Sequence, residues 1–451
     1  MTQWIQQGNK LVGTGAIGAS RQGSAVSLSV DGNTLAVGSK YDNGTMGATW
    51  IFIRSGTTWT QQGDKLIGDG AVGNAYQGAA VSLSADGNTL AVGGYADDRG
   101  AGAVWIFTRS GTSWTQQGDK LVGIGAVGYA YQGIAVSLSS DGNTLAVGGY
   151  NDSGGVGAVW IFTFDGSSWT QYGDKLFGDG VVGLNAYQGI AVSLSSDGNT
   201  LAVGGTLAVG GVGAVWIFTF DGSSWTQYGD KLVGTMAVGN AFQGCAVSLS
   251  ADGNTLAVGG FNDDGGVGAT WIFTFDGASW TQQGDRLVGD SAVGNAFQGI
   301  SVSLSSNGNT VAIGGLNDSN GAGAVWIFNR NGPVWTQYGN KLMGTMAVGN
   351  AFQGCAISLS ADGNTLAVGG QHDNNHIGAT WMWILPPPPP PIPPPPRMIS
   401  GSPPADNAFR HIYVGRVTGR PPSDAHFRFV DIGINNWRGN VGKDGGWNHL
   451  N

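Results

Sequence analysis

The chain has 451 residues, including 82 Gly and 17 Trp, and its 20 Lys and Arg against 29 Asp give a formal net charge of −9. Glycine at this level without a Gly-X-Y period excludes collagen, and an apolar fraction of 41% excludes wholesale disorder. The chain has no Glu and few Lys, so two strong helix formers are scarce. The composition therefore predicts an all-β protein.

Two features bear on location. No run of about 18 apolar residues exists, so no membrane span is expected. The first ten residues lack the basic and apolar regions of a secretory signal. The sequence therefore predicts no particular cellular location for the protein.

The two cysteines, Cys245 and Cys355, occupy the same place in two repeats, so we interpret them as small buried fillers and not as a disulfide framework.

A repeat of about 55 residues extends to Leu385. Two Trp positions recur with this period and account for 14 of the 17 Trp. A period of this length, built from strands and turns, indicates propeller blades or a β-solenoid. An Asp-Gly-Asn-Thr turn, or its Asn variant, recurs once in each of the seven copies, beginning at Asp31, Asp86, Asp141, Asp197, Asp252, Asn307 and Asp362.

The second copy shows the expected order of elements. Residues 77–84 alternate apolar and small polar side chains, as a half-buried strand does. Asp86-Gly87 is a hairpin signal, because Gly accepts the positive φ of a tight turn. A polar loop is expected at 95–100, and the other three strands are expected at 90–94, 104–107 and 114–121.

The two ends of the repeat array complement each other. Residues 4–11 match a fourth strand with no first three strands before it, and the last copy ends after its third strand at 381–385. A closed ring uses the first segment to complete the last blade and so removes an exposed sheet edge. We therefore predict a closed seven-bladed β-propeller of four-stranded blades for residues 1–385.

The chain resembles the FG-GAP repeats of integrin-α-type propellers. Phe242-Gln243-Gly244 is similar to the Phe-Gly element, and Ala91 to Gly94 is similar to the Gly-Ala-Pro element without its proline. Calcium-binding members carry several alternating carboxylates in the turn between strands one and two. Here Ser84 to Asn88 holds one acid, so we expect no metal in these turns, and Asp86 is predicted to be a turn former. No cofactor is predicted.

The propeller region shows no catalytic constellation. Its only His residues are His372 and His376, no Ser or Cys nucleophile motif is present, and no pair of Asp residues breaks the repeat as a glycosidase pair would. We predict that the protein is not an enzyme. An enzyme with its site on the variable loops is the competing hypothesis.

The loops between strands two and three vary most between copies. Their aromatic residues, Asp and Asn suit a glycan, because a ring stacks on a sugar while amides and carboxylates bond its hydroxyls. The alternatives are ordinary loop residues or a metal at Asp97/Asp98 or Asp263/Asp264. The predicted ligand-binding residues are Tyr95, Asp97, Asp98, Tyr150, Asn151, Asp152, Phe261, Asn262, Asp263, Asp264, Asn317 and Asp318.

A second set of rings precedes each first strand and is expected to pack between blades. This set comprises Tyr76, Tyr131, Tyr187, Phe242, Phe297 and Phe352, with Arg21 in the first copy. The loop of the fourth copy, Thr206-Leu207-Ala208-Val209, contains no acid, which weakens any model with seven equal sites.

The segment after the propeller has a different composition. Residues 386–396 are proline except for one Ile, so we predict a polyproline II linker about 34 Å long, either a spacer or a ligand for SH3-, WW- or profilin-type domains. Residues 397–451 carry a net charge of +3 against −12 for residues 1–385. This excess is too small to favour nucleic acid. We expect a small β-rich region anchored through Arg410, Arg416, Arg420, Arg428 and Arg438.

Together these features predict a non-catalytic binding or structural protein. The propeller would contact a glycan or a protein receptor, and residues 386–451 would join an assembly such as a virion or surface appendage, or self-associate. A secreted adhesion protein is the second interpretation.

Overall fold

The computed structural model describes residues 3–180 and 185–387 and two short strands near the C-terminus. The chain divides into two units, Met1–Pro389 and Pro390–Asn451. In the second unit, β29 (Asn440–Val441) pairs antiparallel with β30 (Trp447–Asn448). The predicted linker from residue 388 onward and the five predicted anchoring arginines lie outside the described residues. No described helix is long and apolar enough to cross a membrane.

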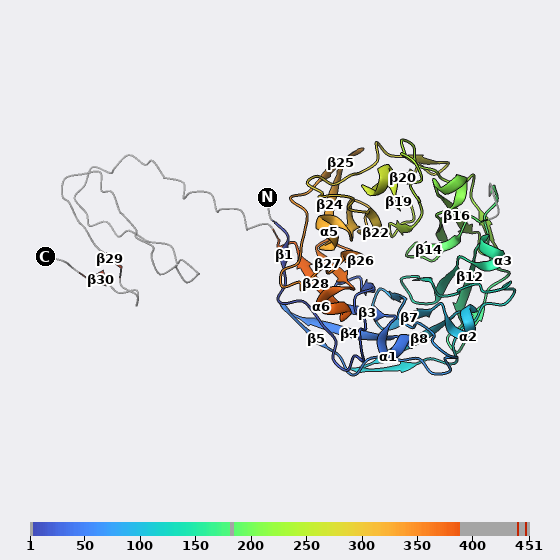
Figure 1. The fold of residues 1–451 in the computed structure, drawn as a ribbon, viewed down its shortest axis with the longest axis horizontal. Helices are drawn as coiled ribbons and strands as arrows, with labels where there is room; N and C mark the ends of the chain where they lie inside the picture. Colours follow the sequence, from blue (N-terminus) through green and yellow to red (C-terminus); the bar gives the residue numbers. More distant parts are fainter. Residues whose placement is uncertain (1–2, 181–184, 388–439, 442–446, 449–451) are drawn as a thin grey trace, which may run out of the picture. The chain divides into compact units, whose positions relative to one another are not determined.

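The first unit is a ring of seven four-stranded antiparallel blades, as predicted (Figure 1). Blade 1 contains β2 (Ala25–Leu28), β3 (Thr34–Ser39), β4 (Ala48–Ser55) and β5 (Thr58–Gln61). Blade 2 contains β6 (Ala80–Leu83), β7 (Thr89–Gly94), β8 (Ala103–Ser110) and β9 (Ser113–Gln116). Blade 3 contains β10 (Ala135–Leu138), β11 (Thr144–Gly149), β12 (Ala158–Phe164) and β13 (Trp169–Gln171). Blade 4 contains β14 (Gln188–Leu194), β15 (Thr200–Gly205), β16 (Ala214–Phe220) and β17 (Trp225–Gln227).

The remaining blades follow the same order. Blade 5 contains β18 (Ala246–Leu249), β19 (Thr255–Gly260), β20 (Ala269–Phe275) and β21 (Trp280–Gln282). Blade 6 contains β22 (Gln298–Leu304), β23 (Thr310–Gly315), β24 (Ala324–Asn331) and β25 (Val334–Gln337). Blade 7 contains β26 (Gln353–Leu359), β27 (Thr365–Gly370), β28 (Ala379–Ile384) and β1 (Ile5–Gln6).

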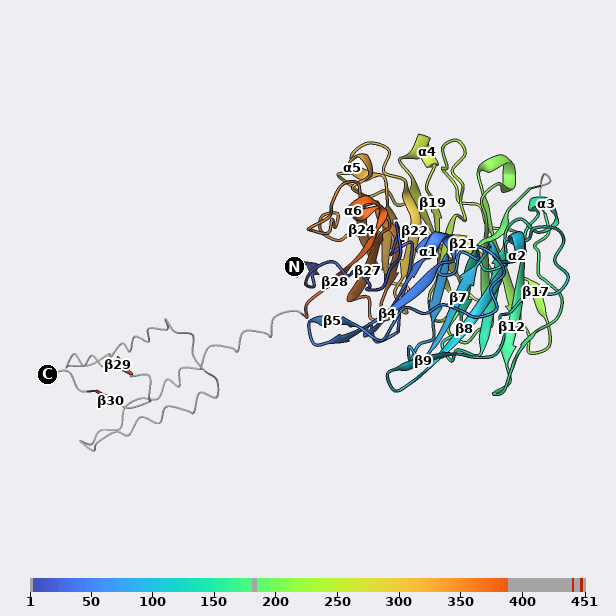
Figure 2. The ribbon, with the colours of Figure 1, turned by 60° about the horizontal axis from the view of Figure 1, so that its bottom comes forward.

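Short helical turns stand where polar loops were predicted between the second and third strands. Figure 2 shows α4 and α5 at its upper edge and α6 below α5. The seven turns are α1 (Asp42–Thr45), α2 (Asp97–Gly100), α3 (Asp152–Gly155), the 3₁₀ turn η1 (Ala208–Gly211), α4 (Asp263–Gly266), α5 (Asp318–Gly321) and α6 (Asp373–His376).

The N-terminal segment supplies the fourth strand of the last blade and so closes the ring, as predicted from its match to a fourth strand. β1 pairs antiparallel with β28 in the register Ile5↔Ile384 and Gln6↔Trp383. Trp4 packs in the core of the last blade, and Lys10 forms an ion pair of 2.5 Å with Asp373. The last blade therefore depends on residues from the opposite end of the propeller sequence.

The first strand of each blade is the innermost, and neighbouring first strands are bonded to each other. In blade 2 the backbone N–H of Leu83 donates to the hydroxyl of Ser27 in blade 1, at 3.0 Å. Just beyond each first strand, one residue donates its N–H to the carbonyl of its counterpart in the next blade, at 2.9 to 3.1 Å. Seven such bonds form a closed circuit through Val30, Ala85, Ser140, Ser196, Ala251, Ser306 and Ala361.

Large side chains fill the blades. The third strand of each blade carries a fully buried Trp, such as Trp105, whose indole N–H donates to the Asp69 carbonyl at 2.7 Å. Cys245 and Cys355 are free, and burial of each thiol raises the pKa of Cys245 to about 12 and that of Cys355 to about 11. Both cysteines are free, as predicted, but they remain partly exposed and are not fully buried.

The repeated Asp residues are turn formers, as predicted. The Asp86 carboxylate accepts hydrogen bonds from the Ser84 hydroxyl at 2.6 Å, and from the backbone N–H and side-chain amide of Asn88 at 2.9 and 2.8 Å. Burial alone would raise the pKa of Asp86, but these hydrogen bonds outweigh it and lower the pKa. The same shift is found at Asp31, Asp141, Asp197, Asp252 and Asp362.

These turns predict a loss of stability in acid. Because the folded-state pKa lies below the unfolded value, the six carboxylates contribute fully above about pH 4 and lose that contribution as the pH falls through their folded pKa. Blade 6 provides the matched replacement, since Asn307 makes the same turn without a titratable group. A variant with all six Asp changed to Asn is expected to lose less thermal stability between about pH 4 and pH 2 than the natural chain. Equal losses in thermal melts would contradict this assignment.

Candidate functional site

Four of the predicted ligand carboxylates lie inside the scaffold. At the start of α2, Asp97 is buried, accepts the backbone N–H of Val72 at 2.7 Å and pairs with Lys120. The same arrangement holds the other three buried carboxylates in this set, Asp152, Asp263 and Asp318, with partners Lys175, Arg286 and Lys341. Each of these Asp side chains binds the loop that enters the blade through a hydrogen bond and also forms an ion pair. The carboxylates are therefore not available to a ligand.

Blade 4 lacks this ion pair. Ala208 stands at the Asp position, and Lys231 donates instead to the Gly180 carbonyl at 2.6 Å. The sequence carried a signal for the pairing, because each Asp of the other described pairs in blades 1 to 6 is followed 23 residues later by Lys or Arg. Two opposite charges repeated together indicate an ion pair more directly than a binding loop.

The second acid of each double-Asp loop points elsewhere. Asp98 and Asp264 are exposed and have left-handed backbones, with φ of 42° and 49°. In each loop one Asp is therefore buried and the next is exposed, so the pair does not converge on one ion. Across the described part of the chain, no group of three or more His, Cys, Asp or Glu side chains is placed to hold a metal.

The predicted Asn residues tie neighbouring loops together. The side-chain amides of Asn151, Asn262 and Asn317 donate to backbone carbonyls at 2.7 to 2.8 Å. The acceptors belong to Tyr129, Asn240 and Asn295 in the loop that enters the same blade. The Asn side chains thus support the loop face while remaining partly exposed.

Two residues per blade form a continuous surface that we call the inner rim. The first precedes the Gln-Gly that opens the innermost strand, and the second follows the second strand directly. All fourteen side chains are partly exposed. In blade order, the first positions are Arg21, Tyr76, Tyr131, Tyr187, Phe242, Phe297 and Phe352, and the second positions are Lys40, Tyr95, Tyr150, Thr206, Phe261, Leu316 and Gln371.

The inner rim changes character around the ring. Both residues are cationic in blade 1, both are phenolic in blades 2 and 3, and aromatic or aliphatic side chains dominate from blade 5 onward. The buried pattern of the blades repeats almost unchanged, whereas this surface does not. Variation on a partly exposed surface of a rigid scaffold is typical of a recognition site.

The phenolic part of the inner rim is a continuous chain of rings. The ring centroids of Tyr76 and Tyr95 are 5.3 Å apart, those of Tyr95 and Tyr131 are 6.0 Å apart, and those of Tyr131 and Tyr150 are 5.5 Å apart. The chain extends to Tyr41 at one end and Tyr187 at the other, at 5.7 and 5.3 Å. The contact between Tyr95 and Tyr131 crosses from blade 2 to blade 3, so the predicted inter-blade packing is confirmed there.

The hydroxyls of these tyrosines are not used by the scaffold. Among the residues that the structure describes, the phenolic oxygens of Tyr41, Tyr76, Tyr95, Tyr131 and Tyr150 have no hydrogen-bond partner. Burial, together with the neighbouring tyrosines, raises the pKa of Tyr95 and of Tyr150. Both hydroxyls therefore stay protonated at neutral pH and can donate as well as accept hydrogen bonds.

The apolar part of the inner rim ends in a pocket at blade 7. Phe352 stacks on His372 at 4.1 Å, and His376 meets His372 edge-on at 4.4 Å. These three rings line a pocket of about 490 Å³, together with Asn350 and Asn375. Burial, with His376 and Arg21 nearby, lowers the pKa of His372 to about 4, so its ring is neutral at physiological pH.

The backbone fixes the first rim position. All seven residues there have φ between 57° and 59°, which is left-handed and unfavourable for bulky side chains. Their N–H groups donate to the helical turn of the preceding blade, as Tyr131 does to the Gly100 carbonyl at 2.9 Å. Hydrogen bonds from the preceding blade therefore hold these residues in a strained backbone conformation, and this conformation positions their aromatic side chains.

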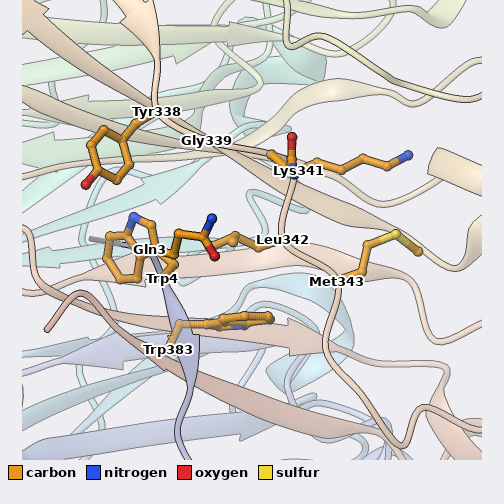
Figure 3. A pocket seen from close by; sticks show the side chains of 9 residues that line it. Gln3, Trp4, Tyr338, Gly339, Lys341, Leu342, Met343 and Trp383 are labelled. Atoms are coloured by element: carbon orange, nitrogen blue, oxygen red, sulfur yellow. The ribbon is translucent and has the colours of Figure 1, made fainter. Parts of the chain in front are cut away.

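A larger pocket lies at the ring closure, where Trp4 beside β1 and Trp383 of β28 face Tyr338 at the end of blade 6 (Figure 3). It has a volume of about 630 Å³, and Trp4, Trp383, Tyr338 and Met343 are among its lining residues. The corresponding residues between blades 5 and 6, including Trp335 and Phe328, line a similar pocket of about 360 Å³. Because this outer groove recurs with the repeat, we attribute it to the blade architecture and place the candidate site at the inner rim.

Sequence reasoning identified part of this surface. Tyr95, Tyr150 and Phe261 were predicted as ligand-binding residues and lie on the inner rim. Lys40 was not singled out, and Arg21 was noted only as a departure from the aromatic pattern. Aligning the copies at both rim positions reveals the signal, since blade 1 alone replaces both aromatic positions by cations.

No family model matches the chain, and no curated protein is similar enough in sequence to match it. Among solved structures, the chain is similar to Kuenenia stuttgartiensis hydrazine synthase, with a TM-score of 0.50, 13% identity, and coverage of 82% of this chain and 98% of that one. It is also similar to a putative 6-phosphogluconolactonase from Bacteroides uniformis, with a TM-score of 0.49, 14% identity, and coverage of 72% and 86%. At these identities the likeness concerns the fold alone, and the fold is that of a seven-bladed β-propeller.

Proposed function

We propose that the protein is a non-catalytic binding protein that recognises a glycan through the inner rim. The observation that carries this proposal is the arc of five tyrosines whose hydroxyls have no hydrogen-bond partner among the described residues. The arc lies on a partly exposed surface held by a rigid ring.

The chemistry of the arc suits sugars. Ring faces pack on the apolar face of a pyranose, and phenolic hydroxyls exchange hydrogen bonds with sugar hydroxyls. The exposed Asp98 and the partly exposed Asn151 border the same loops and add polar contacts. A protein receptor that buries the same tyrosines is the alternative ligand.

The rest of the proposal concerns display. The resemblance to FG-GAP repeats suggests an adhesive propeller, and the proline-rich segment would serve as a stalk to an anchoring region in a virion or surface appendage. A secreted adhesion protein has the same requirements at the inner rim. An enzyme acting at this face is the competing hypothesis.

A substitution taken from the chain itself tests the site. Blade 5 has Phe261 where blades 2 and 3 have Tyr95 and Tyr150, so the double variant Y95F/Y150F keeps the rings and removes two hydroxyls. If each hydroxyl makes one hydrogen bond to the glycan, affinity should fall about tenfold. The measurement is binding of the full chain to a glycan array, followed by titration of the glycans that bind.

Tyr172→Phe is the matched control, because the Tyr172 hydroxyl donates to the Ser223 carbonyl on the outer part of the ring, at 2.9 Å. This variant should bind as the natural chain does. If no glycan binds the natural chain, the glycan proposal fails and a protein receptor becomes the leading hypothesis.

A further inference from the structure

We propose that blade 1 of the inner rim binds the anionic group of an acidic saccharide, a carboxylate or a sulfate, between Arg21 and Lys40. This inference rests on the proposed function and specifies the class of glycan. Blade 1 is the only copy in which both rim residues are cations, although the protein as a whole is acidic.

The two cations share one aromatic neighbour. The Arg21 guanidinium carbon lies 4.2 Å from the ring centroid of Tyr41, and the Lys40 ammonium lies 5.6 Å from the same centroid. Lys40 also lies 5.9 Å from the ring of Tyr95. The cations therefore stand at the end of the tyrosine arc, beside rings whose hydroxyls have no hydrogen-bond partner among the described residues.

Neither cation is neutralised within the described part of the chain. No carboxylate there lies within 4.0 Å of Arg21 or Lys40, because the acids of the adjoining turns are already paired. Asp42 holds Lys65 and Asp373 holds Lys10, each at 2.5 Å. The side chains of Arg21 and Lys40 also donate no hydrogen bond to a described residue.

Two like charges that are partly buried and unpaired are unfavourable until an anion joins them. Burial, with a further contribution from Arg21, lowers the pKa of Lys40, because both disfavour its charged form. A carboxylate or sulfate between the two would accept charge-assisted hydrogen bonds from both side chains. The sugar bearing that group would then lie along Tyr41, Tyr76 and Tyr95.

The matched variant again comes from the chain. R21Y/K40Y gives blade 1 the residues that blades 2 and 3 carry at both positions, and the backbone is already suited, with φ of 59° at Arg21 and at Tyr76. The control R99N/R330F removes two cations elsewhere, using the residues found at Asn320 and Phe275 in other copies. Both variants change the net charge equally, so a difference in their glycan binding depends on where the two cations lie and not on the total charge.

The experiment uses the full chain and an array that carries acidic glycans beside their neutral parents, such as sialyllactose and sulfolactose beside lactose. The natural chain should bind the acidic members about tenfold or more tightly than their parents. R21Y/K40Y should lose this preference, whereas R99N/R330F should keep its affinities within about twofold of the natural values. In the natural chain, raising NaCl from about 50 to 500 mM should weaken acidic binding far more than neutral binding.

The possible failures are distinct. Equal binding of acidic and neutral partners would overturn this inference and leave the glycan proposal standing, as would an acidic preference that survives in R21Y/K40Y. The salt titration needs no variant, so a variant that folds poorly leaves the inference open to contradiction. Binding to no glycan at all would overturn the proposed function itself.

Discussion

Replacing Gly93 by Ala is expected to lower the free energy of unfolding by about 3 kcal/mol, because the new methyl group has no space between two blades. A Cβ at Gly93 would lie 2.1 Å from the Gly133 carbonyl oxygen in the next blade. That oxygen belongs to the backbone and cannot rotate away, so the blades themselves must separate. Gly133 has a φ of 83°, which favours glycine on the other side of the contact.

Denaturant titration of the full chain, with tryptophan fluorescence as the signal, measures this change. The control is Gly111→Ala, where the backbone is also left-handed, with φ of 62°, but nothing lies within 4 Å of the new Cβ. The control should cost about 1 kcal/mol through its backbone alone. If Gly93→Ala were as mild as Gly111→Ala, close backbone contact would not limit the spacing of the blades.

Replacing Asp373 by Ala is expected to destabilise the ring by about 2–3 kcal/mol, because it removes the ion pair that joins the two ends of the propeller sequence. Lys10 would lose its partner, and the backbone N–H of Val348 would lose the acceptor that it contacts at 2.7 Å. The Lys10 side chain is 16% exposed, so water can partly compensate. The expected loss therefore lies below that for a fully buried pair.

Asp97→Ala removes the same type of pair within blade 2, where Lys120 follows in the same copy. Comparing the two variants separates the ion pair from ring closure. We expect Asp373→Ala to be the more harmful and also to increase proteolysis near the N-terminus, since β1 has only two residues in the sheet. Equal stability and equal protease resistance would show that Lys10 does not hold the ring closed.

The sequence predicted the fold well because one pattern was repeated. The out-of-phase start at Trp4 required a partner strand, and the structure supplies it at Trp383 and Ile384. The loops were harder to predict. Asp97 and Asp98 are adjacent and chemically identical, yet a change to left-handed backbone buries one and exposes the other.

The tyrosine arc could not be derived from spacing either. Tyr95 and Tyr131 lie 36 residues apart, and their contact exists only because the ring places the end of one second strand beside the start of the next first strand. The pairing of Asp97 with Lys120 was accessible in principle, because the two charges repeat together. Asp97 and Lys120 lie 23 residues apart in the sequence, and only the folding of the blade brings their charged groups into contact.

The proposed site at the inner rim also has a consequence for the number of ligands that one propeller would bind. Seven near-identical copies suggest seven equal sites per molecule, but the rim residues change from Arg21 and Lys40 in blade 1 to Phe352 and Gln371 in blade 7. The sevenfold repeat of the blades therefore does not extend to the inner rim. The proposed glycan, lying along the tyrosine arc, would meet a cationic end and an apolar end, so it would bind in one direction and with a stoichiometry of one per propeller. Under this proposal, avidity would come from several chains held together and not from the repeats within one chain.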